Sequence, residues 1–123
     1  MSATDVLERL REAINGGTLV IDEFTEHERF RQSLGVLVTV FPDVQLDIQW
    51  IIGDGRRAAG WSTIRGTHQG EFFGIAPTGN AVEYTGLLAV EVDDEDRVVD
   101  FWVLNDFLTL LGQLGAELVP PTA

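Results

Sequence analysis

Alternating apolar and polar residues over the C-terminal two thirds of the chain most strongly constrain its fold. The first alternating segment has its apolar side chains at Val44, Leu46, Ile48, Trp50 and Ile52. A period of two places these side chains on one face of a β-strand and the polar residues between them on the other. Further strands are predicted over residues 57–67, 81–92 and 98–104, separated by glycine-rich or acidic turns. This pattern predicts a largely antiparallel sheet.

Helical spacing occurs on both sides of this strand region. The first apolar stripe follows the capping candidates Ser2 and Thr4 and consists of Val6, Leu7, Leu10 and Ile14. A second helix is predicted to begin at about Glu26, because residues 25–28 match a T-x-x-E capping box, and to end before Pro42. A short strand over 18–24 joins these helices, and a closing helix spans 106–114. The order predicts an α+β fold with helices on one side of a curved sheet.

The length and composition fit one soluble domain. We expect a single domain over residues 1–117 and a tail over 118–123 that contains Pro120-Pro121. The formal net charge of −12 would repel phosphate backbones and anionic membranes, so no nucleic-acid or membrane partner is expected. The chain has no cysteine, which excludes disulfides and thiolate metal sites. The N-terminus resembles neither a signal peptide nor a membrane span, and a cytoplasmic location is expected.

Three local patterns are interpreted as structural. Gly53-x-Gly55-x-x-Ala58 follows a strand like a dinucleotide-binding loop, but strand-forming residues follow it where that motif needs a helix. The acidic run 93–96 lacks the ligand spacing and glycine of an EF-hand, so it is predicted to be a solvated turn. His27 lies in the first turn of a helix and is interpreted as a surface residue.

The concave face of such a sheet, partly covered by helices, is where a domain of this size can keep a cavity. The predicted ligand-contacting residues are the aromatics Trp50, Trp61, Phe72, Phe73, Tyr84 and Trp102. Each could instead be ordinary core, because large aromatic side chains dominate protein cores.

Two titratable residues stand out near the ends of the predicted strands. His68 ends the second long strand, and Asp106 lies where the last strand meets the closing helix. A carboxylate beside an apolar pocket has its pKa raised by desolvation and can accept a proton near neutral pH. Two structural alternatives remain open: Asn105 or Asp106 could cap the last helix, and His68 could make a structural hydrogen bond.

Several motifs, taken together in this order, resemble the SnoaL-like polyketide cyclases, also called ester cyclases, of the nuclear transport factor two-like superfamily. They are Phe41-Pro42-Asp43, Gly66-Thr67-His68, Gly70-Glu71-Phe72, Pro77-Thr78-Gly79, Trp102-x-x-x-Asp106 and Gln113-Leu114-Gly115. The resemblance implies a cone-shaped pocket within a cystatin-like α+β barrel. It also implies a cofactor-free, metal-free intramolecular aldol cyclisation, with Asp106 as acid/base, His68 as a pocket residue and Trp102 as a pocket wall.

These observations leave two classes of function open. The first is a cyclase-type enzyme, or related acid/base enzyme, that acts on a small hydrophobic carbonyl compound, with Asp106 and His68 as its catalytic residues. Asp106 would be the general acid/base, and His68 would help to position a carbonyl or enolate oxygen. Ketosteroid isomerases and epoxide hydrolases share the fold, so the fold does not choose the reaction. The second is a non-catalytic binding or dimeric scaffold module, favoured by an N-terminal region that looks abbreviated beside that of the family. An exposed sheet face leads us to expect a homodimer.

Overall fold

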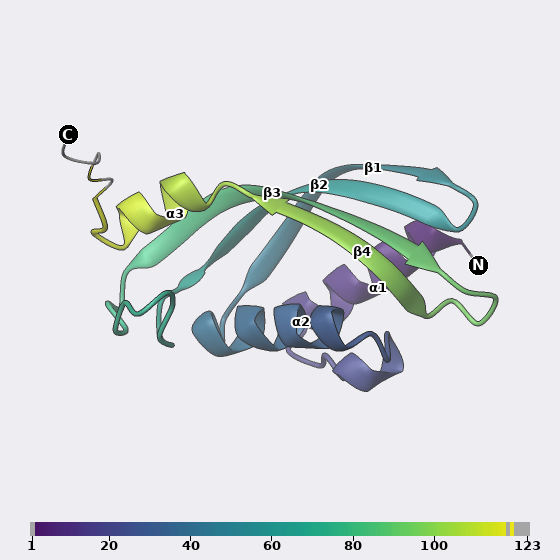
Figure 1. Cartoon of the computed structure of the whole chain (residues 1–123), viewed down its shortest axis with the longest axis horizontal. Coiled ribbons are helices and arrows are strands. Elements are labelled where there is room, and N and C mark those ends of the chain that lie inside the picture. The colour runs from purple at the N-terminus through teal and green to yellow at the C-terminus, as the bar shows by residue number, and fades with distance from the viewer. Residues whose placement is uncertain (1, 118, 120–123) are drawn as a thin grey trace.

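A computed structural model describes residues 2–117 and 119 of the chain (Figure 1). The elements are α1 (Ala3–Asn15), a 3₁₀ helix η1 (Ile21–Glu23), α2 (Glu28–Val40), β1 (Gln45–Asp54), β2 (Arg57–Thr67), β3 (Ala81–Val92), β4 (Val98–Asn105) and α3 (Phe107–Gln113). The predicted tail over 118–123 lies, apart from Val119, outside the described residues.

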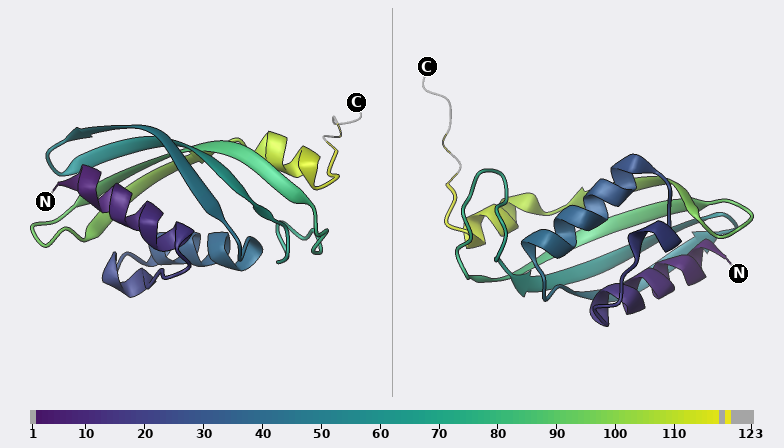
Figure 2. Two further views of the ribbon diagram at one scale, coloured as in Figure 1. Left: turned by 180° about the vertical axis from the view of Figure 1, so that it is seen from behind. Right: turned by 90° about the horizontal axis from the view of Figure 1, so that it is seen from below.

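The four strands form one antiparallel sheet in the order β1-β2-β3-β4. The sheet is curved, and α1 and α2 both lie against its concave face, whereas α3 extends beyond the end of β4 (Figures 1 and 2). The predicted α+β class, with helices on one side of a curved antiparallel sheet, is confirmed. The concave face is therefore the only face of the sheet that α1 and α2 cover.

Helix α1 forms as its sequence predicts. The Ser2 side chain accepts from the Asp5 backbone N–H and the Asp5 carboxylate accepts from the Ser2 N–H, which makes a complete capping box. The buried residues of α1 form one apolar stripe along the helix and are Ala3, Val6, Leu7, Leu10 and Ile14. Burying each of its larger apolar side chains contributes roughly 1.5–3 kcal/mol. The stripe packs this helix on β1 and β2.

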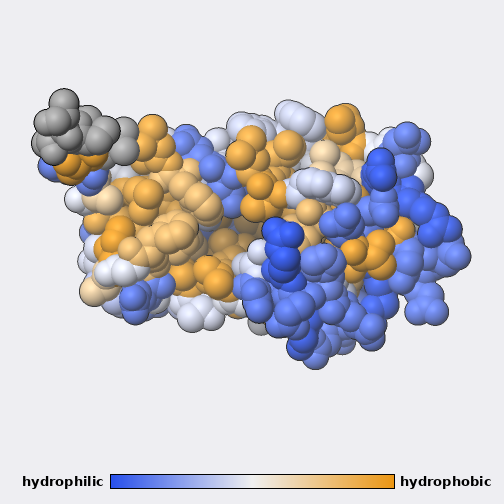
Figure 3. All heavy atoms as spheres, in the orientation of Figure 1, coloured by the Kyte–Doolittle hydropathy of each residue, from blue (hydrophilic) through white to orange (hydrophobic). Residues whose placement is uncertain are grey.

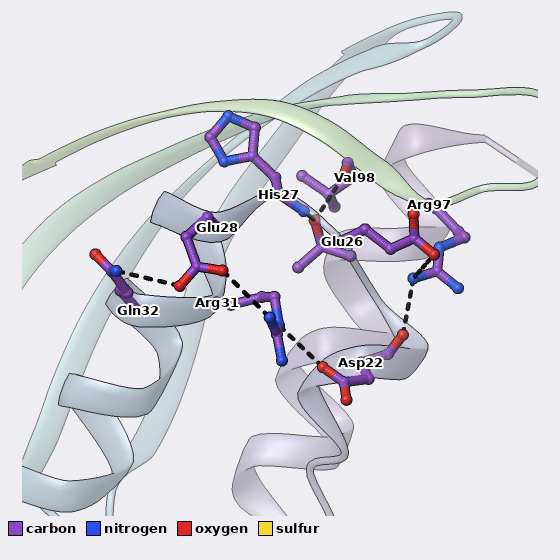
Figure 4. A network of polar contacts seen from close by, with 9 residues as sticks. Asp22, Glu26, His27, Glu28, Arg31, Gln32, Arg97 and Val98 are labelled. Carbon is purple, nitrogen blue, oxygen red and sulfur yellow. Dashed lines mark hydrogen bonds and ion pairs between the residues drawn. The ribbon is translucent and has the colours of Figure 1, made fainter.

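The region between α1 and α2 differs from the prediction. The Thr25 hydroxyl is buried and donates to the Val98 carbonyl at 2.6 Å, so it does not cap a helix. His27 caps α2 instead, its Nδ1 accepting from the Phe30 N–H. The helix begins at Glu28, directly after His27 (Figure 4). Residues 18–24 contain the 3₁₀ helix rather than the predicted strand, because their chain turns to bring Thr25 beside β4. His27 is accordingly a half-buried capping residue.

A bulge in β1 changes which of its side chains face the core. The register between β1 and β2 shifts between Ile48 and Trp50. Beyond this shift, Ile51 packs on the core while Trp50 and Ile52 are exposed on the convex face. Strict alternation predicted that Trp50 and Ile52 would face the core. The prediction is wrong for these residues because the extra residue at the bulge reverses which side chains face each side of the sheet.

Candidate functional site

A cavity of about 680 Å³ lies between the concave face of the sheet and the helices α1 and α2. Its wall is mostly aliphatic and aromatic, and its apolar lining residues include Leu7, Leu10, Ile14, Phe30, Leu34, Leu37, Phe41, Leu46, Ile48, Ile64, Phe72, Tyr84, Leu88 and Phe107. Figure 3 shows a hollow near the middle of the molecule, with apolar surface gathered over the half that contains α3. The volume is that of a small-molecule site.

Small residues on the concave face leave the space for this cavity. Gly60 and Ser62 on β2 and Gly86 on β3 all line it. Larger side chains at these positions would fill the centre of the curved sheet, as side chains do in an ordinary core. Gly86 pairs regularly with Ser62 and with Asn105, so β3 has no bulge at this residue.

Aromatic residues surround the end of the cavity near α3. The Phe107 ring lies 5.7 Å from the Phe72 ring and 5.8 Å from the Phe73 ring, measured between centroids. Phe73 has a positive φ of 49° at the tip of the loop and is 70% exposed. Phe72, Phe73 and Tyr84 line the cavity, and their contact with a ligand stays a prediction.

The three tryptophans do not line this cavity, and the prediction that they form its wall is wrong. Trp50 and Trp61 are paired across β1 and β2 beyond the bulge, on the convex face. Trp102 pairs with Ala89 and also faces outward, since Phe101, Val103 and Asn105 are the β4 residues that point to the helices. Trp50 is 47% and Trp102 is 49% exposed.

His68 is completely buried, but it does not line the cavity. Its Nδ1 lies 2.9 Å from the Thr78 hydroxyl and accepts from the Thr78 backbone N–H at 3.1 Å. The backbone of His68 also bonds to Gly79 and Asn80. These contacts close the loop 68–80 on itself, which is the structural alternative that the sequence left open.

Asp106 caps α3, and its carboxylate is exposed. It accepts from the Thr109 backbone N–H at 3.1 Å and from the Thr109 hydroxyl at 2.6 Å. These bonds lower the pKa of Asp106 below its ordinary value, so the expected rise in its pKa is wrong. Asp106 and His68 lie near the same end of the sheet, but they do not share a hydrogen bond and neither lines the cavity.

Several polar groups that line the cavity were not predicted from the sequence. Ser62 and Asn105 lie on its sheet wall beside Tyr84, while Arg11, Arg29 and Glu71 belong to its helix and loop walls. Burial raises the pKa of Tyr84 to about 12, so its hydroxyl stays protonated at neutral pH. The sequence signal that could have identified Ser62 and Asn105 is a polar residue on a strand, when the residues two positions away are apolar and face the core.

A separate polar cluster outside the cavity holds η1 against α2 and β4 (Figure 4). Arg31 pairs with Asp22 and Glu28 at 3.0 and 3.2 Å, and Arg97 donates to the Asp22 carbonyl at 2.9 Å. These groups are mutually satisfied and fix the entry into α2. Within residues 2–117 and 119, no cluster of three or more His, Asp or Glu residues is suited to a metal, and no helix is long and apolar enough to cross a membrane.

A family profile described as SnoaL-like polyketide cyclase matches residues 5–114. No curated protein matches the chain. Among solved structures, IdmH of Streptomyces antibioticus, a proposed polyketide cyclase, is 32% identical with a TM-score of 0.71, and the match covers 94% of this chain and all of that one (100%). AclR of Streptomyces galilaeus, a proposed hydroxylase, is 25% identical with a TM-score of 0.79, covering 92% of this chain and 95% of its own.

A SnoaL-like protein of Jannaschia sp. CCS1 has a TM-score of 0.76 at 18% identity, covering 97% of this chain and 93% of its own. At that identity the likeness concerns the fold alone. The family profile begins at residue 5 and therefore includes η1 and most of α1, so the match does not support an abbreviated N-terminal region.

Proposed function

The chain belongs to the SnoaL-like polyketide cyclase family, and we propose that it binds a small hydrophobic carbonyl compound in its cavity and promotes a cofactor-independent, aldol-type cyclisation. The observation that carries this proposal is the apolar cavity of about 680 Å³ with hydrogen-bonding groups on its sheet wall. An apolar wall favours the rings of the ligand, and a few polar groups orient it. The names of IdmH and AclR refer to different reactions, so the reaction type is part of the proposal.

Asp106 is the acid/base in this proposal. It lies between Asn105 and Phe107, which both line the cavity. The proposed mechanism requires a change of its side-chain rotamer that turns the carboxylate toward the ligand. Its present bonds to Thr109 would then be exchanged for the acidic proton between two carbonyl groups of the substrate. The enolate formed in this way would attack a further carbonyl carbon of the same molecule, which forms the carbon–carbon bond and an alkoxide. The protonated carboxyl group of Asp106 would then return the proton to this alkoxide. His68 supports the loop that carries Phe72 and does not contact the reacting atoms.

Glu71 offers the direct comparison for Asp106, because it is a carboxylate that already lines the cavity. The experiment follows the cyclisation of an aromatic compound with a β-keto ester side chain by liquid chromatography and mass spectrometry. Asp106→Asn should lower turnover by roughly 100-fold or more, the usual contribution of a general base, while ligand affinity stays within twofold. Glu71→Gln should leave turnover close to that of the unmodified chain.

Equal turnover in Asp106→Asn and the unmodified chain would remove Asp106 from the mechanism. Loss of turnover in Glu71→Gln, with turnover retained in Asp106→Asn, would identify Glu71 as the general base. Because Asp106 caps α3, the urea-unfolding midpoint of Asp106→Asn must be measured beside its activity.

A second candidate function is a binding module without catalysis. It is favoured by the chemistry of the sheet wall, where Ser62, Tyr84 and Asn105 contribute no carboxylate or imidazole. Such a module would bind the same aromatic carbonyl compounds, and their binding would raise its melting temperature. It would leave the compounds chemically unchanged. Binding without product formation in the unmodified chain would favour this function over the enzyme.

A further inference from the structure

Three polar side chains surround Gly86 at the centre of the concave face. Gly86 pairs with Ser62 on β2 and with Asn105 on β4. Tyr84 precedes Gly86 by two residues on β3 and therefore faces the same side of the sheet. Its diagonal neighbours Ser62 and Asn105 lie within about 7–8 Å, a distance that long side chains span. The three groups can thus reach one point in the cavity.

The missing side chain of Gly86 is what admits the Asn105 carboxamide. The Asn105 Oδ1 lies 2.1 Å from the position that a β-carbon on Gly86 would occupy, and Asn105 Cγ lies 3.2 Å from it. Any other residue at Gly86 would displace this carboxamide. The carboxamide therefore lies over the middle strand of the cavity floor rather than outside the edge of the sheet.

These polar groups have no protein partner in the described part of the chain. The pKa of Tyr84 is raised by burial alone, with no contribution from a hydrogen bond. Within residues 2–117 and 119, Nε2 of His68 is the only fully buried side-chain nitrogen or oxygen atom that lacks a hydrogen-bond partner. The polar atoms of Tyr84, Ser62 and Asn105 are therefore not sealed in the core and remain open to the cavity. Polar groups in an apolar enclosure usually have a partner, and here the cavity is where one can be supplied.

We infer that Tyr84, Asn105 and Ser62 form a binding site for a carbonyl oxygen of the ligand, with the Tyr84 hydroxyl and the Asn105 N–H₂ group as donors. This inference rests on the proposed function and specifies where the ligand's oxygen lies. A neutral tyrosine donates one hydrogen bond, and a carboxamide donates two, so both suit an oxygen acceptor. If the carbonyl becomes an enolate, the same donors stabilise the charge that develops on its oxygen.

The position of this site also orients the ligand. The charged lining residues Arg11, Arg29 and Glu71 come from the helices and the loop, whereas the proposed oxygen site lies on the sheet and carries no formal charge. The aromatic rings of Phe41 and Phe107 lie 6.2 and 6.5 Å from the Tyr84 ring. A planar ring system would thus pack among these aromatics with its buried carbonyl directed at Gly86.

Two probes of nearly the same shape test the inference. 9-Fluorenone carries a ketone where fluorene carries a methylene group, so their relative affinity reports on recognition of the oxygen. Isothermal titration calorimetry should show that the unmodified chain prefers fluorenone by about tenfold, the size expected for a hydrogen bond to a buried oxygen. Tyr84→Phe and Asn105→Leu should each lose most of this preference without weakening the binding of fluorene.

Ser33 provides the matched control for Ser62. Both serines line the cavity, but Ser33 lies on α2 and Ser62 on the sheet. Ser62→Ala should reduce the preference for fluorenone, whereas Ser33→Ala should keep it. The melting temperature and circular dichroism of each variant show that it is folded before its affinity is compared.

Equal binding of the two probes by the unmodified chain, or an unchanged preference in both Tyr84→Phe and Asn105→Leu, would overturn the oxygen site and leave the proposed ligand class intact. Binding of neither probe would count against the hydrophobic ligand class itself, and with it against the oxygen site. A preference that disappears in Ser33→Ala as strongly as in Ser62→Ala would place the recognition on α2 and also overturn the inference.

Discussion

The Nδ1 atom of His68 accepts a hydrogen bond from the Thr78 backbone N–H at 3.1 Å and lies 2.9 Å from the Thr78 hydroxyl. The pair joins the first and last parts of the loop that presents Phe72 and Phe73 to the cavity. Because the Thr78 N–H donates to Nδ1, the neutral imidazole carries its proton on Nε2. The buried histidine therefore acts on the cavity through the shape of the loop.

We predict that His68→Leu lowers the free energy of unfolding by about 2–4 kcal/mol, because it removes a buried acceptor and leaves the Thr78 N–H unpaired. His27→Ala is the matched control, since His27 is the only other histidine and is half-buried at the start of α2. Loss of this cap should cost about 1 kcal/mol. Urea unfolding measures both changes, and a His68→Leu chain as stable as the unmodified one would contradict the structural role.

The parts of the fold that could be predicted from sequence are those in which local pattern and tertiary packing agree. The limits of β2 and β3 match the alternating segments over 57–67 and 81–92, and the stripe of α1 is buried as its spacing indicates. The bulge after Ile48 could not be predicted, because its unpaired residue has no distinctive sequence. That one residue reversed the expected orientation of Trp50.

The candidate site was harder to predict because it depends on empty space. Gly60, Ser62 and Gly86 create the cavity by being small, and smallness in a strand also indicates a bulge or a close backbone approach. Asp106 illustrates a second limit. An aspartate between a strand and a helix is compatible with capping or with acid/base chemistry, and only the position of Thr109 in space identified its capping contacts.

The hydrogen bonds of the Asp43 carboxylate make the stability of the folded chain depend on pH. Its carboxylate accepts from the Thr67 hydroxyl at 2.7 Å and from the Thr67 N–H at 2.8 Å, which lowers the pKa of Asp43 below its ordinary value. The folded chain therefore favours the ionised form. The resulting stabilisation is complete above the unfolded-state pKa of about 3.9 and is lost as the pH falls through the lower native pKa.

Asp43→Asn should therefore lose less stability than the unmodified chain when the pH is lowered from about 5 to 3. Urea-unfolding midpoints across this range measure the difference. Asp47→Asn is the control, because Asp47 is exposed on β1, which begins just after Asp43, and makes no side-chain hydrogen bond in the described residues. Parallel pH profiles for Asp43→Asn and the unmodified chain would show that the bond to Thr67 does not contribute.

Substitution of two glycines by alanine is predicted to change the free energy of unfolding in opposite directions. A β-carbon on Gly35, inside α2, would meet no atom within 4 Å, whereas one on Gly70 would lie 2.5 Å from the Thr39 carbonyl oxygen. Gly35→Ala should raise the free energy of unfolding by about 0.5–1 kcal/mol, because alanine has less backbone freedom to lose in the helix. Gly70→Ala should lower it, because backbone atoms must move. Chemical denaturation of both variants tests the pair, and a stabilised Gly70→Ala would contradict this close approach.

The convex face of the sheet carries two apolar rows that α1 and α2 leave uncovered. Cross-strand pairing aligns Trp50, Trp61, Leu87 and Leu104 in one row and Ile52, Ala59, Ala89 and Trp102 in the next. Two ion pairs, Arg57–Glu91 and Arg65–Glu83, also lie on these strands, each with a separation of 2.6 Å. A surface with paired charges avoids the repulsion that the net charge of −12 would otherwise cause between copies.

We propose that a second copy of the chain covers these rows, which makes the protein a homodimer. Leu104 is 71% exposed and belongs to the first row, so Leu104→Asp should place unpaired charges in the interface and shift the chain toward monomer. Val20→Asp is the control, because Val20 is an exposed apolar residue (51%) that precedes η1 and lies outside the sheet. Sedimentation velocity at micromolar concentration should give a dimer for the unmodified chain and Val20→Asp, and a monomer for Leu104→Asp. A monomeric unmodified chain would contradict the proposal, and a dimeric Leu104→Asp would move the interface to another surface.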